Sequence, residues 1–160
     1  MASTAPTVHL LCGLPGAGKT THARRLAEEL TAVRFSLDEW MLRLYRLRYD
    51  EPDYAARLPA CTELIWDTAT QVLRLGHDVV LDWNQWSRAR RAHWHDKARR
   101  AGCQVLLHHV DVPVEVAVAR ARGRTDPSRS HDIDEAGVRH LARIFEPPAA
   151  DEGIPFCVVS

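Results

Sequence analysis

One stretch near the start of the sequence has residue types at a spacing that suits phosphate binding. Residues 13–20, GLPGAGKT, match the pattern G-x-x-x-x-G-K-[ST] in full. Glycines at these positions allow the backbone to wrap around an anion and direct successive N–H groups at it. A lysine here reaches the β- and γ-phosphates of a nucleoside triphosphate, and the hydroxyl that follows holds Mg²⁺. The sequence therefore predicts that ATP or another nucleoside triphosphate binds with Mg²⁺ through Gly13, Pro15, Gly16, Ala17, Gly18, Lys19 and Thr20.

Two aspartates follow apolar, strand-like runs and are candidates for the chemistry beside the phosphates. The run at 79–81 ends in Asp82, which we expect beside the magnesium ion, although an aspartate here could also cap the next turn. Asp38 follows another such run and could accept the proton of an attacking hydroxyl. It could also cap the helix that begins at this point, and one carboxylate can do both. Trp83 follows Asp82 where motor ATPases carry a water-activating glutamate, which argues against a dedicated hydrolase.

Arginines gather in two places. Arg120 and Arg124 are four residues apart, a spacing that shares one face on a helix. From such a face they could stack on a base and neutralise transferring charge. The alternative is an ordinary solvated face. The second place is the predicted helix at 87–102, whose basic residues could form a face that follows nucleic-acid phosphates or, alternatively, an ordinary solvated face. These residues are Arg88, Arg90, Arg91, Lys97, Arg99 and Arg100.

Aromatic residues lie close to both aspartates in the sequence. Trp83 and Trp86 flank Asn84 just after Asp82, while Trp40 and Tyr45 lie on the helix after Asp38. If they face the cleft, they form an aromatic pocket for an acceptor; otherwise they belong to the core.

The elements that must position these residues alternate between strand and helix. We expect strands at 8–12, 32–37, 78–81, 104–110 and 155–159, and helices at 19–30, 38–47, 60–75, 87–102, 114–122 and 133–145. Residues 48–59 and 123–132 are expected to be connections. The alternation predicts one domain over 1–160, a three-layer α/β fold with a parallel five-stranded sheet, helices on both faces, and ligands at the carboxyl ends of the strands.

Composition favours a soluble, cytoplasmic protein. The 160 residues include 21 basic and 21 acidic side chains, so no net charge calls for nucleic acid or a membrane. The first residues lack the pattern of a signal peptide, and no stretch approaches the roughly 18 apolar residues of a membrane span. Four cysteines without metal-binding spacing are expected to be free thiols in a reducing compartment, and the oligomeric state stays open.

With these motifs in order, the chain resembles the small P-loop kinases related to the phage-type polynucleotide kinase 5′-kinase domain, chloramphenicol phosphotransferase and zeta toxins. The resemblance covers nearly the whole chain, through GLPGAGKTT (13–21), SLDEWM (36–41), DVVLDWN (78–84), the basic helix (87–102), HVDVPVEVAVARARGR (109–124) and DIDEAGVRHLARIFEPP (132–148). It implies a P-loop kinase fold with the strand order 2-3-1-4-5 and a short lid at 123–132.

Residue by residue, the resemblance implies roles for the side chains named above. It makes Asp38 the general base and Asp82 a carboxylate on the magnesium or the acceptor side. Thr21 joins the nucleotide-binding residues, while Arg120 lies near the adenine and Arg124 acts on the phosphates during transfer.

One departure from the polynucleotide kinase pattern bears on the acceptor. That pattern carries an arginine for the acceptor's phosphate three residues beyond the base, where this chain has Met41. We therefore favour an ATP-dependent kinase that phosphorylates a hydroxyl of a small molecule. A polynucleotide or nucleoside 5′-hydroxyl kinase is the first alternative, and a non-catalytic nucleotide-binding switch is the second.

Overall fold

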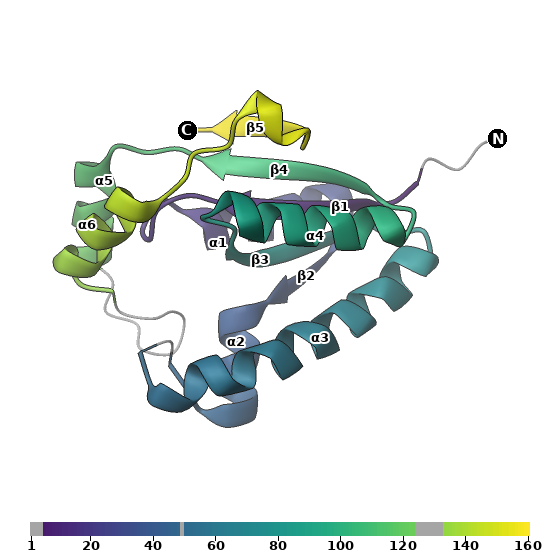
Figure 1. Ribbon diagram of the computed structural model, residues 1–160, viewed down its shortest axis with the longest axis horizontal. Helices are drawn as coiled ribbons and strands as arrows, with labels where there is room; N and C mark the ends of the chain where they lie inside the picture. Colours follow the sequence, from purple (N-terminus) through teal and green to yellow (C-terminus); the bar gives the residue numbers. More distant parts are fainter. Residues whose placement is uncertain (1–4, 49, 124–132) are drawn as a thin grey trace.

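A parallel five-stranded sheet forms the centre of the molecule (Figure 1). The computed structural model describes residues 5–48, 50–123 and 133–160. The strands are β1 (Thr7–Cys12), β2 (Val33–Ser36), β3 (Val79–Asn84), β4 (Gln104–Val110) and β5 (Phe156–Val159). Every neighbouring pair is parallel, and the order is β2-β3-β1-β4-β5, which confirms the expected fold and strand order.

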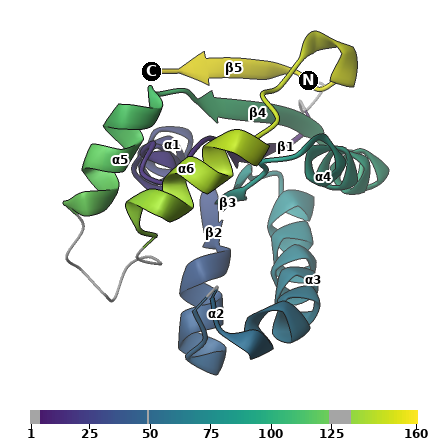
Figure 2. The same cartoon turned by 60° about the vertical axis from the view of Figure 1, so that its left-hand side comes forward.

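Helices cover both faces of this sheet (Figure 2). They are α1 (Lys19–Leu30), α2 (Leu37–Tyr45), α3 (Pro52–Arg74), α4 (Arg88–Arg100), α5 (Val114–Arg122) and α6 (Glu135–Ile144), with a 3₁₀ turn η1 (Ala150–Glu152). On one face Leu11 and Val80 pack against α1. On the other, Val8 and Leu10 join a larger core with residues of α3 and α4. Because both faces are covered, the central strands are almost continuously apolar.

The sequence prediction was wrong about where α3 begins. Residues 48–59, expected to be a polar connection, contain the first turns of this helix, which starts at Pro52. Proline is favourable at that position because the first N–H groups of a helix have no partner within the helix. Pro59 lies inside the helix, where proline is usually avoided. The longer helix brings Tyr54 to the carboxyl edge of the sheet.

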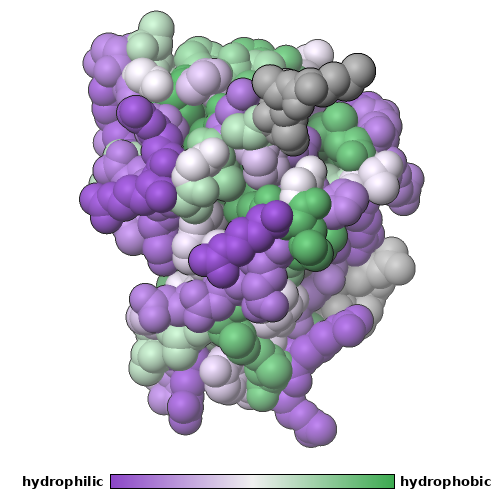
Figure 3. Space-filling view, turned by 90° about the vertical axis from the view of Figure 1, so that its right-hand side faces the viewer, coloured by the Kyte–Doolittle hydropathy of each residue, from purple (hydrophilic) through white to green (hydrophobic). Residues whose placement is uncertain are grey.

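The outer surface and the cysteines agree with an ordinary globular protein. Figure 3 views the end of the molecule opposite the carboxyl edge of the sheet, where hydrophilic side chains predominate and apolar ones are scattered. None of the helices in the described part of the chain is long and apolar enough to cross a membrane. All four cysteines are free, as expected.

A buried arginine fixes α4 to the C-terminal segment. Arg91 is fully buried, and its Nε and Nη2 donate to the two carboxylate oxygens of Glu152 at 2.7 and 2.8 Å. Its Nη1 donates to the carbonyl oxygens of Gln85 (3.0 Å) and Glu146 (2.8 Å). The Arg91 guanidinium also holds the pKa of Glu152 below its usual range. This arginine, counted above in a basic face, is therefore part of the core.

We expect Arg91→Ala to lower the free energy of unfolding by about 3 kcal/mol, because the substitution leaves the Glu152 carboxylate buried without its counter-charge. The matched control is Arg88→Ala on the same helix, which breaks an exposed ion pair with Asp151 and should have a far smaller effect. Urea denaturation measures both. Equal losses in the two variants would mean that the buried pair contributes no more than a surface pair.

Candidate functional site

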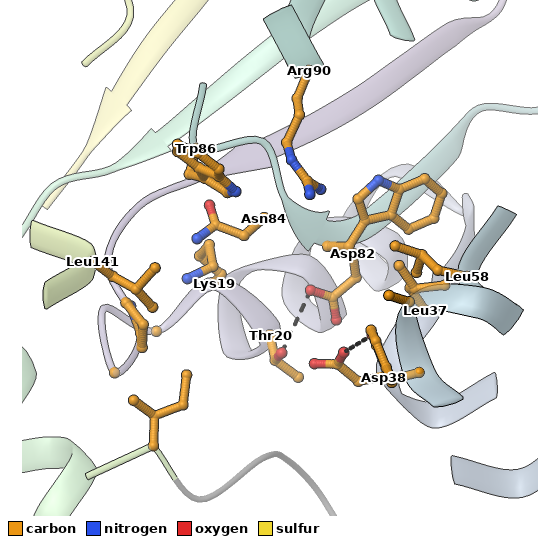
Figure 4. A pocket seen from close by; sticks show the side chains of 17 residues that line it. Lys19, Thr20, Leu37, Asp38, Leu58, Asp82, Asn84, Trp86, Arg90 and Leu141 are labelled. Carbon is orange, nitrogen blue, oxygen red and sulfur yellow. Dashed lines mark hydrogen bonds between the residues drawn. The ribbon is translucent and has the colours of Figure 1, made fainter. Parts of the chain in front are cut away.

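The candidate site is a cavity of about 420 Å³ at the carboxyl edge of the sheet (Figure 4). The carboxyl ends of parallel strands are the usual place for ligands in open α/β sheets. Residues from the phosphate-binding loop form one wall, and residues from β3, α2, α3, α4 and α6 complete it. The lining residues are Pro15, Gly16, Gly18, Lys19, Thr20, Leu37, Asp38, Tyr54, Ala55, Leu58, Asp82, Trp83, Asn84, Trp86, Arg90, Ile133 and Leu141.

The loop between β1 and α1 has a backbone that requires glycine. Gly16 and Gly18 have φ values of 81° and 101°, in the left-handed region. A Cβ atom on Gly16 would lie 2.5 Å from the carbonyl oxygen of Ala117 on α5, and one on Gly13 would lie 2.5 Å from that of Val110. The loop is thus packed directly against backbone, and a side chain at either position would have to displace it.

Lys19 is the first residue of α1 and lies over this loop. Its Nζ donates to the carbonyl oxygens of Gly13 (3.0 Å) and Leu14 (2.8 Å). Because α1 begins here, its N-terminal N–H groups and the lysine ammonium both lie at the loop. A helix N-terminus combined with a lysine is a suitable site for phosphate.

Asp82 connects the loop to the sheet through a small polar network. The Thr20 hydroxyl donates to its Oδ1 at 3.4 Å, while the Nε of Arg34 donates to its Oδ2 at 2.8 Å. Burial raises the pKa of Asp82, and nearby Asp38 adds to this, whereas Arg34 and Thr20 oppose it. Arg34 also binds Glu39 at 2.8 Å, which lowers the pKa of that carboxyl.

This arrangement fits a magnesium ion. Mg²⁺ prefers oxygen ligands and retains several of its waters. Thr20 Oγ1 and Asp82 Oδ1 are two such oxygens side by side at the phosphate loop, and Arg34 occupies the opposite carboxylate oxygen. Across residues 5–48, 50–123 and 133–160, no cluster of three or more His, Cys, Asp or Glu side chains is arranged to hold a metal.

Asp38 faces the cavity and does not cap α2. The cap is Ser36, whose hydroxyl accepts from the backbone N–H of Glu39 at 3.3 Å. The carboxylate of Asp38 instead accepts from the hydroxyl of Tyr54 at 3.4 Å and lines the cavity. The capping role considered for Asp38 therefore belongs to Ser36.

The aromatic residues divide between cavity and core. Trp86 lines the cavity, and so does Trp83, although Trp83 is largely buried against Trp94, with ring centroids 5.1 Å apart. Trp40 and Tyr45 pack against the main core and are absent from the described lining. Of the two aromatic groups in the sequence, the one after Asp82 reaches the cavity.

A second cavity, of about 440 Å³, lies on the other side of the phosphate loop. Arg120 on α5 reaches it and donates from Nη1 to the carbonyl oxygen of Ala17 at 3.0 Å. Two nucleotide-binding candidates, Thr21 and Arg120, thus line this second cavity, whereas Asp38 lines the first. The lining is Gly16, Ala17, Gly18, Thr21, His22, Arg25, Val110, Arg120, Val159 and Ser160. Arg124 and all but the first residue of the expected lid at 123–132 lie outside the described residues.

Sequence reasoning missed three residues of the site. Arg34 reaches Asp82 from the neighbouring strand, and a lone arginine in a strand gives no sign of its partner. Tyr54 lies within residues 48–59, which the sequence predicts to be a connection, although the proline at the first helical position is a usable signal. Arg90 was counted with the basic helix, whose cavity-facing member could not be singled out without the packing of α4.

Comparisons with known proteins agree with the fold that carries this site. A protein-family model described as AAA domain matches residues 8–148. A chain of the Pnkp1/Rnl/Hen1 RNA repair complex is 22% identical with a TM-score of 0.74, over 88% of this chain and 44% of that one. Kti12 of Chaetomium thermophilum in complex with ADP-AlF3 is 20% identical (TM-score 0.69; 97% and 89% covered). A gluconokinase from Sinorhizobium meliloti 1021 is 16% identical (TM-score 0.64; 98% and 85% covered).

These structural likenesses show the fold alone at such identities. No curated protein sequence matches the chain.

We expect Gly16→Ala to weaken ATP binding at least about tenfold, because its Cβ would meet the Ala117 carbonyl and displace the loop backbone. Gly76→Ala is a matched control: Gly76 has a similar φ of 85°, but a Cβ there meets nothing within 4 Å. It reports the conformational cost alone, far from the site. Calorimetric titration with ATP measures both. Unchanged affinity in Gly16→Ala would show that the loop does not hold the phosphates.

Proposed function

We propose that this chain, which belongs to the P-loop kinase family described as AAA domain, transfers the γ-phosphate of ATP to a hydroxyl of a small molecule. The observation that carries the proposal is that the phosphate loop and Asp38 line one cavity. A triphosphate in the loop and a hydroxyl beside Asp38 would share that space. Positioning of this kind supplies most of the catalysis in phosphoryl transfer.

In the proposed reaction the acceptor hydroxyl gives its proton to the Asp38 carboxylate as its oxygen attacks the γ-phosphorus. The bond between that phosphorus and the β–γ bridging oxygen breaks, and ADP leaves with the electron pair. Lys19 would offset the charge that develops on the phosphate oxygens. The Tyr54 hydroxyl, 3.4 Å from Asp38 Oδ1, would orient the base.

The nucleotide would extend from the cavity that contains Asp38 toward the second cavity. Its phosphates would lie on the N–H groups of residues 13–20, and its base near Arg120 and Thr21. Binding of ADP-AlF3 by the similar Kti12 supports a nucleotide in this loop. Mg²⁺, held by Thr20 and Asp82, would add positive charge at the phosphates. We assign Arg124 to the phosphates as well.

The burial and pairing of the basic residues on α4 favour a small acceptor over nucleic acid. Arg91 is buried and Arg88 is paired with Asp151, so α4 does not present a continuous basic face. Met41, where polynucleotide kinases carry their acceptor-phosphate arginine, is fully buried in the core. The likeness to a gluconokinase supports a small acceptor, while the likeness to a chain of an RNA repair complex keeps a 5′-hydroxyl kinase as the alternative.

A non-catalytic nucleotide-binding switch explains the position of Asp38 in the cavity less well than a kinase does. Such a protein needs the phosphate loop but no carboxylate on the acceptor side. A structural role as a helix cap would account for Asp38 without catalysis, but Ser36 fills that role.

Asp38→Asn should cut the rate of phosphoryl transfer at least about 100-fold, because an amide cannot accept the hydroxyl proton. ATP affinity should change little, since Asp38 is placed on the acceptor side. Asp53→Asn, an exposed aspartate in the first turn of α3, is the control for the same chemical change nearby. Single-turnover transfer from γ-labelled ATP gives the rate, and titration gives the affinity. A matching loss of ATP affinity would assign Asp38 to the nucleotide or metal instead.

A further inference from the structure

The wall of the cavity formed by α4 and the end of β3 carries a positive charge without a counter-charge. Arg90 lies in the first turn of α4, and in Figure 4 it points into the cavity from the side opposite Asp38. Its neighbours Arg88 and Arg91 each bind a carboxylate. No carboxylate of the described residues pairs with Arg90. Its guanidinium carbon lies 5.6 Å from the centroid of the Trp86 ring, which holds the side chain at the wall.

The other charges of the cavity already have partners or roles. Among the described lining residues the cations are Lys19 and Arg90 and the anions are Asp38 and Asp82. Lys19 lies on the phosphate loop, and Asp82 is paired with Arg34 outside the lining. Arg90 is therefore the positive charge of the acceptor side. The Arg90 side chain is exposed, and its planar fork suits bidentate binding of a carboxylate or phosphate that enters the cavity.

A neighbouring polar atom indicates that the ligand also donates hydrogen bonds. The Oδ1 of Asn84 is buried and has no hydrogen-bond partner. Asn84 lies between Lys19 and Trp86 in Figure 4 and lines the cavity. This oxygen has almost no accessible surface, so a ligand hydroxyl reaches it only when the amide turns toward the cavity. Leaving a buried oxygen unsatisfied is costly, and a hydrogen bond from the ligand would favour that turn.

We propose that the acceptor is a small hydroxylated anion, whose carboxylate or phosphate binds Arg90 while one hydroxyl donates to Asn84 and another faces Asp38. This rests on the proposed function and names the class of its acceptor. A volume of about 420 Å³, shared with the transferred phosphate, suits a short chain or a single ring. Leu58 and Leu141 give the remaining walls an apolar character.

Matched pairs of compounds test the proposal: glycerate and glycerol, gluconate and glucitol, glucose 6-phosphate and glucose. Calorimetric titration of the ADP-loaded protein gives binding, and transfer from γ-labelled ATP gives turnover. We expect at least one anion to bind and to be phosphorylated better than its neutral partner, on the order of tenfold or more. The carboxylate and phosphate pairs then distinguish the two sources of the charge.

Arg90→Gln should raise the KM for that anion on the order of 10- to 100-fold, because a charged hydrogen bond is lost, with ATP affinity unchanged. Arg90→Lys should restore part of the loss. Arg99→Gln, an exposed position on the same helix, is the control and should have no effect.

Three results would overturn the proposal: neutral partners that bind as well as the anions, binding of none of the anions, or an Arg90→Gln variant that loses ATP affinity instead. Transfer to the neutral compounds at rates equal to those for the anions would overturn the anion site and leave the kinase function in place. Binding of an anion through Arg90 without any transfer would support the anion site and contradict the kinase function.

Discussion

Parallel pairing of β1 with β3 on one side and β4 on the other is the constraint on which the site depends. It brings the carboxyl ends of these strands to one edge, so that the phosphate loop after β1 lies beside Asp82 of β3. The β1–β3 register runs to Leu10 opposite Leu81 and then shifts, so that Leu11 lies opposite Asn84. Asp82 pairs instead with Ser36 at the end of β2, two residues before Asp38. Residues distant in the sequence therefore reach one cavity through backbone pairing.

The two aspartates at this edge have different surroundings, and this suggests different tasks. Asp82 is buried, and the Arg34 guanidinium compensates its charge on one oxygen while Thr20 contacts the other. Asp38 is less buried and accepts a hydrogen bond from the hydroxyl of Tyr54. A carboxylate fixed by an arginine is suited to hold a charge in place, whereas one beside an open cavity is suited to exchange a proton with a ligand.

Much of this could be predicted from the sequence because local patterns decide it. The phosphate-loop motif is local, and α1 begins and ends at the predicted residues 19 and 30 because its apolar stripe and flanking turns mark both ends. The acceptor side depends on contacts between distant segments. No local pattern encodes the packing on which these contacts depend. That packing pairs Arg34 with Asp82, buries Arg91 against Glu152 and exposes Arg90 to the cavity. The start of α3 was missed because prolines usually end helices.

We propose that this edge of the sheet moves phosphate from a nucleotide to a hydroxyl and not to water. The most direct measurement is ATP consumption with and without a panel of nucleosides, oligonucleotides, sugars, sugar acids and antibiotics, with the products identified by mass spectrometry. We expect slow ATP consumption by the protein alone and faster consumption with an acceptor, with one phosphorylated molecule formed for each ATP used. Release of inorganic phosphate at the same rate whatever is added would contradict it.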